Sequence, residues 1–319
     1  MGRWPVLEAL WEKRVLLVSG KGGVGKTTLA AALAVAAARA GRTVLLAELS
    51  PEEDGPSPLA ALVGARDVGP RVTRVRPGLN FVRLSAAEGH RHFLEKALPA
   101  RWLAEAALRT RALRRFLEAG PALREMGLMY QMLTLLRHTR PDGRYAHPLT
   151  VVDLPATGHA LALAALPQRV LALMPGGPIG RDVREGLDFL QDPVRTAVVL
   201  TSLPEPLPVS ESLHVASELR RLELPLSVAV LNRMPEDPFT VESRAALNRL
   251  LAVHGPHQGA HALARLDRAH AASVRLRREL RAPLLTLPEL SVTGPALAEA
   301  LAETFAPRRE DALWQEALP

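Results

Sequence analysis

Residues 14–28 of this 319-residue chain read RVLLVSGKGGVGKTT. The first part, residues 14–19, is almost wholly apolar and predicts a buried β-strand, and the Ala- and Leu-rich residues 27–40 predict an α-helix. Between them lies the pattern G-x-x-x-x-G-K-T, with its fixed positions at Gly20, Gly25, Lys26 and Thr27. A strand, a glycine-rich loop and a helix in this order form the context that a phosphate-binding loop requires.

The residue types of this loop suit ATP and Mg²⁺. Glycines let backbone N–H groups turn inward around phosphates, and the start of a helix adds a partial positive charge. Lys26 is expected to neutralise phosphate charge, and Thr27 is expected to offer its hydroxyl oxygen to Mg²⁺. The residues predicted to bind the nucleotide here are Gly20, Gly22, Gly23, Val24, Gly25, Lys26, Thr27 and Thr28.

Lys21 is a second lysine in the same loop, although the chain has few lysines and many arginines. The run K-G-G-V-G-K-T-T from Lys21 to Thr28 resembles the deviant Walker A of the arsenite-pump, septum-placement and partition ATPases. The resemblance implies that Lys21 acts in trans, on the nucleotide of a partner subunit, and that ATP promotes a dimer. The partner is expected to be a second copy or a paralogue. From the residue alone, a role in cis stays open.

A second motif, LTVVDLPATGH, spans residues 149–159. Asp153 at the carboxyl end of an apolar strand fits a Walker B aspartate that holds Mg²⁺, although an Asp there can also simply cap the next helix. The run D-x-P-x-T-G-H from Asp153 to His159 is similar to the switch II of the arsenite-pump and tail-anchored-protein-targeting ATPases. The resemblance implies that His159 belongs to a switch.

Later segments extend the resemblance along most of residues 14–306. Asn232 ends an apolar strand, where that family uses an Asn amide to read the adenine, and a turn-forming role is the alternative. The run from Leu203 to Glu205, with the helix 210–222 after it, also resembles the family. So does the stretch around Pro288, where the resemblance implies a loop that closes over the base.

Switch I departs from the family pattern. The second strand is normally followed by an Asp that positions the attacking water, and Ser50 occupies its place here. Glu48 is the first candidate to supply the missing carboxylate, and Asp54 is the second. Hydrolysis is expected, and a nucleotide-binding switch with slow or absent turnover is the alternative.

The specialised functions of the family have less support. The chain contains no cysteine, which excludes thiolate activation of arsenite and a C-x-x-C zinc site between subunits. The helical region 86–140 carries Met126, Met129, Met132 and Leu136 at helical spacing. These residues are predicted to be core, and an apolar groove for a protein client is the alternative.

Composition sets limits on partners and location. The net charge is +7, but arginines are scattered along the chain and aromatic residues make up only 4%, so no nucleic-acid-binding surface is expected. Arg109, Arg111, Arg114 and Arg115 are interpreted as a solvated helix face. The longest apolar run, residues 29–38, is too short to span a membrane, and no signal peptide is evident. We therefore expect a cytoplasmic protein without membrane insertion.

The order of segments predicts an α/β fold, a doubly wound and mainly parallel sheet of the P-loop type with an inserted helical subdomain. We expect one domain over residues 1–319, with helical insertions at about 86–140 and 241–281. The predicted strands are residues 14–19, 43–49, 79–84, 149–154, 170–174, 196–201, 226–231 and 283–287.

These expectations combine into an ATP-hydrolysing, Mg²⁺-dependent, dimeric switch of the arsenite-pump and tail-anchored-targeting superfamily. One alternative is a catalytically weak scaffold or regulatory protein that binds ATP without turnover. Another is a positioning ATPase of the partition type. That alternative predicts a basic amphipathic tail, whereas residues 307–319 are mainly acidic and apolar.

Overall fold

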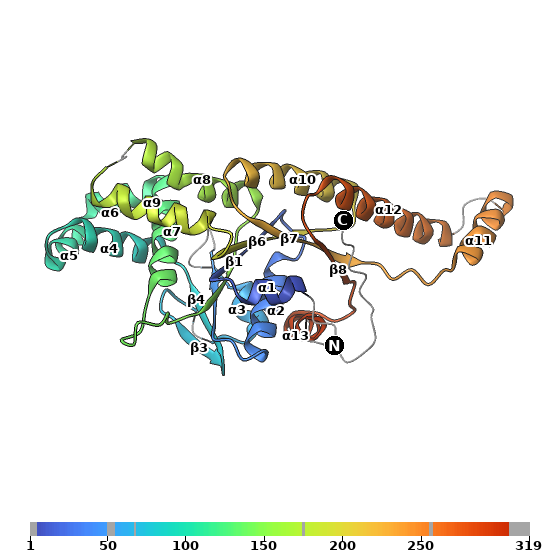
Figure 1. Ribbon diagram of the computed structural model, residues 1–319, viewed down its shortest axis with the longest axis horizontal. Helices are drawn as coiled ribbons and strands as arrows, with labels where there is room; N and C mark the ends of the chain where they lie inside the picture. The colour runs from blue at the N-terminus through green and yellow to red at the C-terminus, as the bar shows by residue number, and fades with distance from the viewer. Residues whose placement is uncertain (1–4, 50–54, 67, 174–175, 255–257, 306–319) are drawn as a thin grey trace.

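The computed structural model describes residues 5–49, 55–66, 68–173, 176–254 and 258–305. These residues form one eight-stranded sheet in the order β3-β4-β2-β5-β1-β6-β7-β8 (Figure 1). Neighbouring strands are parallel except for the antiparallel pair β3 and β4. The strands are β1 (Val15–Gly20), β2 (Val44–Glu48), β3 (Thr73–Arg76), β4 (Leu79–Arg83), β5 (Leu149–Asp153), β6 (Thr196–Ser202), β7 (Leu226–Met234) and β8 (Leu284–Pro288). The doubly wound, mainly parallel α/β fold is therefore confirmed.

One predicted strand is wrong and one observed strand was not predicted. Residues 170–173 belong to helix α8 (Thr157–Leu173), and Met174 lies outside the described residues. A short apolar run fits a strand or a buried helix equally well, and this run continues the apolar pattern of the preceding helix. The edge strand β3 has only four residues, two of them arginines, so it lacks an apolar strand pattern.

Helices cover both faces of the sheet, as the alternating side chains of β1 show. Leu16 and Val18 pack into one core, and Val15 and Leu17 pack into the other. Figure 1 shows α2, α3 and α13 below the sheet and α8, α10 and α12 above it. The remaining helices are α1 (Pro5–Trp11), α2 (Lys26–Arg39), α3 (Pro58–Val63), α4 (Ala86–Ala97), α5 (Arg101–Arg109), α6 (Arg111–Ala119), α7 (Pro121–Arg137), α9 (Gly177–Gln191), α10 (Pro206–Arg221), α11 (Val241–His254), α12 (Gln258–Glu279) and α13 (Gly294–Thr304).

The helices between β4 and β5 meet α9 around one buried carboxylate, Asp182. Lys96 pairs with Asp182, the Tyr130 hydroxyl donates to it at 2.6 Å, and Arg137 donates to it at 2.9 Å. Burial opposes the ionisation of Asp182, but the hydrogen bonds from Lys96 and Tyr130 and the nearby positive charges outweigh it and lower its pKa. This cluster therefore joins α4, α7 and α9 into one packed group.

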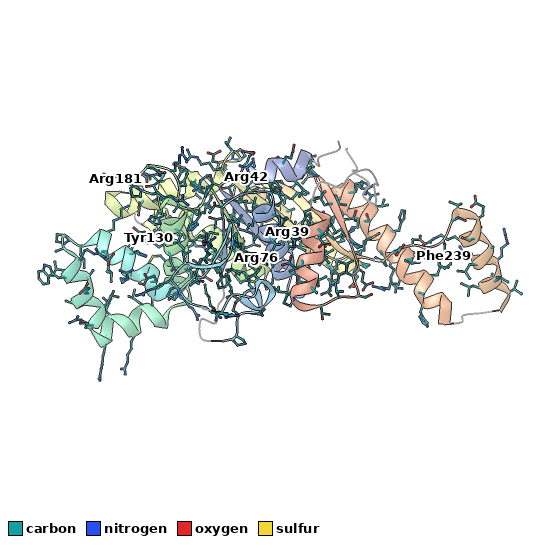
Figure 2. All side chains as sticks on the ribbon, turned by 90° about the horizontal axis from the view of Figure 1, so that it is seen from below. Arg39, Arg42, Arg76, Tyr130, Arg181 and Phe239 are labelled. Atoms are coloured by element: carbon teal, nitrogen blue, oxygen red, sulfur yellow. The ribbon has the colours of Figure 1, made fainter. Side chains whose placement is uncertain are left out.

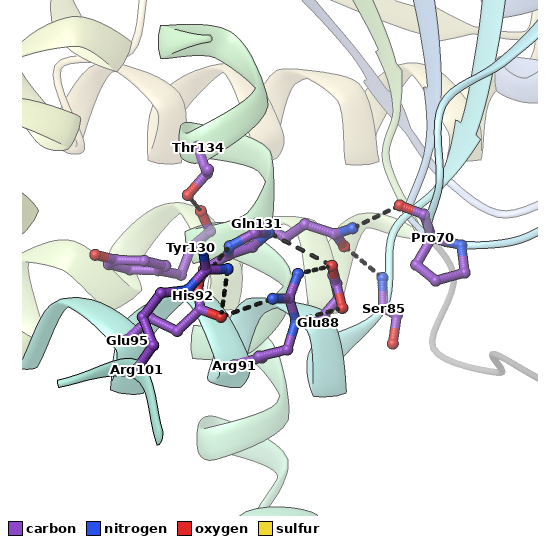
Figure 3. A network of polar contacts seen from close by, with 10 residues as sticks. All are labelled: Pro70, Ser85, Glu88, Arg91, His92, Glu95, Arg101, Tyr130, Gln131 and Thr134. Carbon is purple, nitrogen blue, oxygen red and sulfur yellow. Dashed lines mark hydrogen bonds and ion pairs between the residues drawn. The ribbon is translucent and has the colours of Figure 1, made fainter. Parts of the chain in front are cut away.

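Gln131 of α7 links this group of helices to the sheet (Figure 3). Its side-chain oxygen accepts from the Ser85 N–H at 2.6 Å, and its side-chain nitrogen donates to the Pro70 carbonyl at 3.2 Å. Ser85 follows the end of β4, and Gln131 is only 2% exposed. The amide therefore satisfies backbone groups at the point where the inserted helices begin.

Three of the four residues in the predicted Met and Leu stripe of α7 are core, as expected, and Met126 is partly buried against the same core. Met129, Met132 and Leu136 are 2%, 6% and 1% exposed and pack in the core that also contains strand residues of β1 and β5. Because these side chains are buried, they do not line an open groove. Trp102 of α5 is 67% exposed and is a large apolar side chain on the surface of this helical group.

The second group of inserted helices lies between β7 and β8. Figures 1 and 2 place α11 and Phe239 at one end of the molecule, opposite the end that carries α5 and Tyr130. In the described part of the chain, none of the helices combines the length and the apolar character needed to cross a membrane.

Candidate nucleotide-binding site

The glycine-rich loop joins β1 to α2 and bends tightly because its glycines adopt backbone angles that other residues rarely reach. Gly23 and Gly25 have φ of 83° and 92°. A Cβ on Gly20 would lie 2.3 Å from the Thr201 carbonyl oxygen, and a Cβ on Gly25 would lie 2.4 Å from the side-chain nitrogen of Asn232. Side chains at these positions would therefore push the loop away from the ends of β6 and β7.

Lys26 begins α2 and points back into the loop. Its side chain is almost buried, and its Nζ donates to the Lys21 carbonyl at 2.9 Å. Burial lowers the pKa of Lys26 because it removes water from the ammonium, while the negative charge of Asp153 raises it. The loop thus holds one cation with little solvent around it, next to a buried carboxylate.

Asp153 ends β5, in register with Val18 of β1 and Glu48 of β2. Burial raises its pKa to about 7, whereas a hydrogen bond from Thr27 and the charge of Lys26 lower it and the charge of Glu48 raises it. Its Oδ1 is buried and has no hydrogen-bond partner among the described residues. An unsatisfied buried carboxylate oxygen next to a threonine hydroxyl fits the outer coordination of Mg²⁺.

Glu48 lies at the carboxyl end of β2, in the strand position beside Asp153, and is 5% exposed. Its Oε2 is 3.4 Å from the Arg83 Nε across the β2–β4 pair. Burial raises the pKa of Glu48, while a hydrogen bond from Ser57 and the charge of Arg83 lower it. The structure thus places Glu48 at the same end of the sheet as the loop, where its carboxylate forms an ion pair with Arg83.

The other switch I residues, Ser50 and Asp54, lie outside the described residues.

Asn232 contacts the loop directly, which the sequence did not indicate. Its side-chain nitrogen donates to the Val24 carbonyl at 2.9 Å, and its side-chain oxygen accepts from the Arg233 N–H at 3.0 Å. Both ends of the amide are therefore engaged, and the contact fixes the loop against the end of β7.

A cavity of about 520 Å³ lies beside the ends of β7 and β8, a volume that suits a small molecule. Arg233, Pro235 and Glu289 contribute to its lining. Asn232 and Pro288, the residues predicted to bind the base, do not line the cavity, but the next residue of each does. The loop after β8 is held in place by the Glu289 N–H, which donates to the Met234 carbonyl at 3.0 Å.

Lys21 turns away from the buried part of the loop and pairs with a residue that sequence reasoning did not single out. Its Nζ is 2.7 Å from Glu211 Oε1, and the two side chains are 39% and 35% exposed. Glu211 lies in α10, within a helix that was predicted, but no sequence pattern shows that residue 211 faces residue 21.

A strand, a tightly turned glycine loop and a helix place a buried lysine close to a buried aspartate at the end of the neighbouring strand. This combination makes the chain a P-loop nucleotide-binding protein.

Comparison with known proteins identifies the family. A sequence model of the anion-transporting ATPases matches residues 13–176, which include the loop and Asp153. ATPase BagA of Mycobacterium tuberculosis is 31% identical over 238 residues, which cover 72% of this chain and 67% of that protein. An uncharacterized protein of Streptomyces coelicolor is 34% identical over 303 residues, which cover 91% of this chain and 67% of that protein.

An arsenical pump-driving ATPase of Escherichia coli is 30% identical over 217 residues, which cover 66% of this chain but only 33% of that protein. This chain belongs to the anion-transporting ATPase family and is an ATP-hydrolysing enzyme.

Proposed function

We propose that this ATPase is Mg²⁺-dependent and works as a dimeric switch that closes on ATP. The observation that carries the proposal is the placement of the second loop lysine. Lys26 is buried within its own loop, whereas the ammonium of Lys21 is partly exposed at the surface and pairs with α10. A cation displayed in this way is available to a nucleotide in another subunit. The motif of residues 20–28 and the family membership support the same reading.

The chain's own residues divide the work at the phosphates. Backbone N–H groups of residues 20–25 and the start of α2 attract phosphate oxygens, and Lys26 neutralises their charge. Thr27 and Asp153 would hold Mg²⁺, which proteins usually bind through one or two side chains together with phosphate oxygens and water. When bound, the metal withdraws charge from the transferred phosphoryl group.

The test of the dimeric switch is the protein's mass in solution with and without Mg²⁺ and ATP. We expect the mass to double with ATP for the wild type and to stay that of a monomer for Lys21→Ala. Lys13→Ala is the matched control. Lys13 precedes β1 and donates to the Pro193 carbonyl, away from the loop. A wild-type mass that does not respond to nucleotide would reject the switch. A doubling only after addition of a paralogue would indicate a heterodimer.

Glu48→Gln tests which carboxylate orients the attacking water. We expect turnover to fall about 100-fold, as for loss of a group that assists proton transfer, while ATP affinity stays within about two-fold. Steady-state turnover and equilibrium binding measure the two effects. Glu12→Gln is the control, since Glu12 forms an exposed ion pair with Arg42. Unchanged turnover in Glu48→Gln would move the role to Asp54.

The same variant separates the switch from the scaffold alternative. A scaffold that uses ATP only as a ligand would hold its partner equally well in the wild type and in Glu48→Gln. A switch that reopens on hydrolysis would release its client in the wild type and retain it in Glu48→Gln. The client is proposed to bind the helical group formed by α4–α7 and α9, where Trp102 is exposed. A cytoplasmic location is part of the same proposal.

A further inference from the structure

The pair formed by Lys21 and Glu211 joins the loop to α10 within one subunit. We propose that Glu211 is a positioning residue that holds Lys21 in its own protomer and releases it when the dimer closes. The inference rests on the proposed dimeric switch. It adds a residue that sets how readily the subunits associate.

The two carboxylate oxygens of Glu211 differ in their contacts, and only one of them has a partner. Its Oε1 forms the ion pair with Lys21, while its Oε2 is buried without a hydrogen-bond partner in the described part of the chain. A buried carboxylate oxygen that makes no hydrogen bond is unfavourable. A carboxylate with one unsatisfied oxygen adds little to the stability of α10, so its role is sought in the pair with Lys21.

Glu211 is the fixed half of the pair. Its neighbours in α10, Val209 and Ser212, are buried, and Ser210 accepts a hydrogen bond from Arg275 of α12 at 2.8 Å. Lys21 in contrast has a flexible four-carbon stem and lies in a loop. Release of the pair therefore requires movement of the lysine and leaves the helix in place.

A second contact couples this release to nucleotide entry. The carbonyl of Lys21 accepts from the Lys26 Nζ. When Lys26 turns to a phosphate oxygen, that hydrogen bond is lost, and the Lys21 peptide is held by one contact fewer. Phosphate binding at Lys26 thus loosens the residue that Glu211 retains.

The expected effect is modest for each subunit and larger for the dimer. A partly exposed ion pair typically changes an equilibrium about two- to five-fold. Because both subunits must release a lysine, loss of both pairs should strengthen the dimer by the square of this factor, about 4- to 25-fold.

The test compares Glu211→Gln with Glu218→Gln in the full chain. Glu218 lies on the same helix and pairs with Arg221, so it is a matched control for charge and helix context. The dimer dissociation constant is measured at saturating ATP and Mg²⁺ by sedimentation. We expect a decrease of about 4- to 25-fold for Glu211→Gln only. In a Lys21→Ala background, which is expected to stay monomeric, Glu211→Gln should not restore the dimer.

A second readout works without nucleotide or dimer. Reductive methylation labels Lys13, Lys21, Lys26 and Lys96, and mass spectrometry resolves each site. We expect Lys21 to react about two to five times faster in Glu211→Gln, with Lys13 as the internal standard.

An unchanged rate at Lys21 would overturn the pairing. An unchanged or weaker dimer would overturn the release, and a weaker one would show that Glu211 supports the closed state. Lys21 could be methylated faster in Glu211→Gln while no variant changes its mass with ATP. That result would confirm the pairing but reject both the dimeric switch and the release.

Discussion

Replacement of Lys26 by alanine is expected to lower kcat/KM for ATP about a thousand-fold. The Lys26 side chain is 8% exposed, and its charge lies close enough to Asp153 to alter the pKa of that carboxyl. An ammonium in such a water-poor site stabilises phosphate charge far better than one in bulk water. Steady-state turnover over a range of ATP concentrations measures the effect, and equilibrium binding separates loss of affinity from loss of rate.

Lys13→Ala is the control for this change. Lys13 is also a lysine next to β1, but its Nζ donates to the Pro193 carbonyl at 2.6 Å, away from the loop. We expect this variant to retain turnover within about two-fold, as usual for an exposed contact. A Lys26→Ala protein that folds and still turns over ATP at a tenth of the wild-type rate would contradict the assigned role.

Replacement of Asp153 by asparagine is expected to separate activity from stability. Turnover should fall at least about 100-fold, because the variant loses the carboxylate that would hold Mg²⁺. The nucleotide-free protein, in contrast, should become more stable above neutral pH. An ionised carboxylate is costly in this site, where burial raises its pKa from 3.8 to about 7.

The sign of the pH effect follows from that pKa. Between about pH 4 and 7 the folded protein holds the Asp153 proton more tightly than the unfolded chain, so the free energy of unfolding falls as pH rises. The full penalty, about 4 kcal/mol, applies above pH 7. Asn carries no charge and removes this penalty, which already includes the favourable charge of Lys26, so we expect a net gain of up to about 4 kcal/mol.

Denaturant unfolding at pH 5 and pH 8 checks this prediction. The gain from Asp153→Asn should be larger at pH 8 than at pH 5. Asp182→Asn is the contrasting control, since its partners lower the pKa of that carboxyl. This variant should lose stability at pH 8 and keep its turnover. A destabilised Asp153→Asn at pH 8 would contradict the ionisation argument.

The sequence predicted the structure correctly where that structure depends on residues close together in the chain. The glycine-rich loop of residues 20–28 follows from the placement of its glycines. The strands β5 and β7, which carry Asp153 and Asn232, follow from their apolar runs. The same reasoning was wrong for residues 170–173, because such a short apolar run carries no periodicity that separates a strand from a helix. It missed β3, whose four residues, TRVR, carry no apolar strand pattern.

The sequence by itself therefore determined the fold class, the phosphate loop and the two lysines in it. Only the tertiary structure decided which distant residues meet at that loop. Asn232 contacts Val24, Glu48 lies beside Asp153, and Glu211 pairs with Lys21 because strand order and the packing of α10 bring them together. Such contacts join residues far apart in the chain and leave no local pattern, since a side chain's partner depends on how whole elements pack.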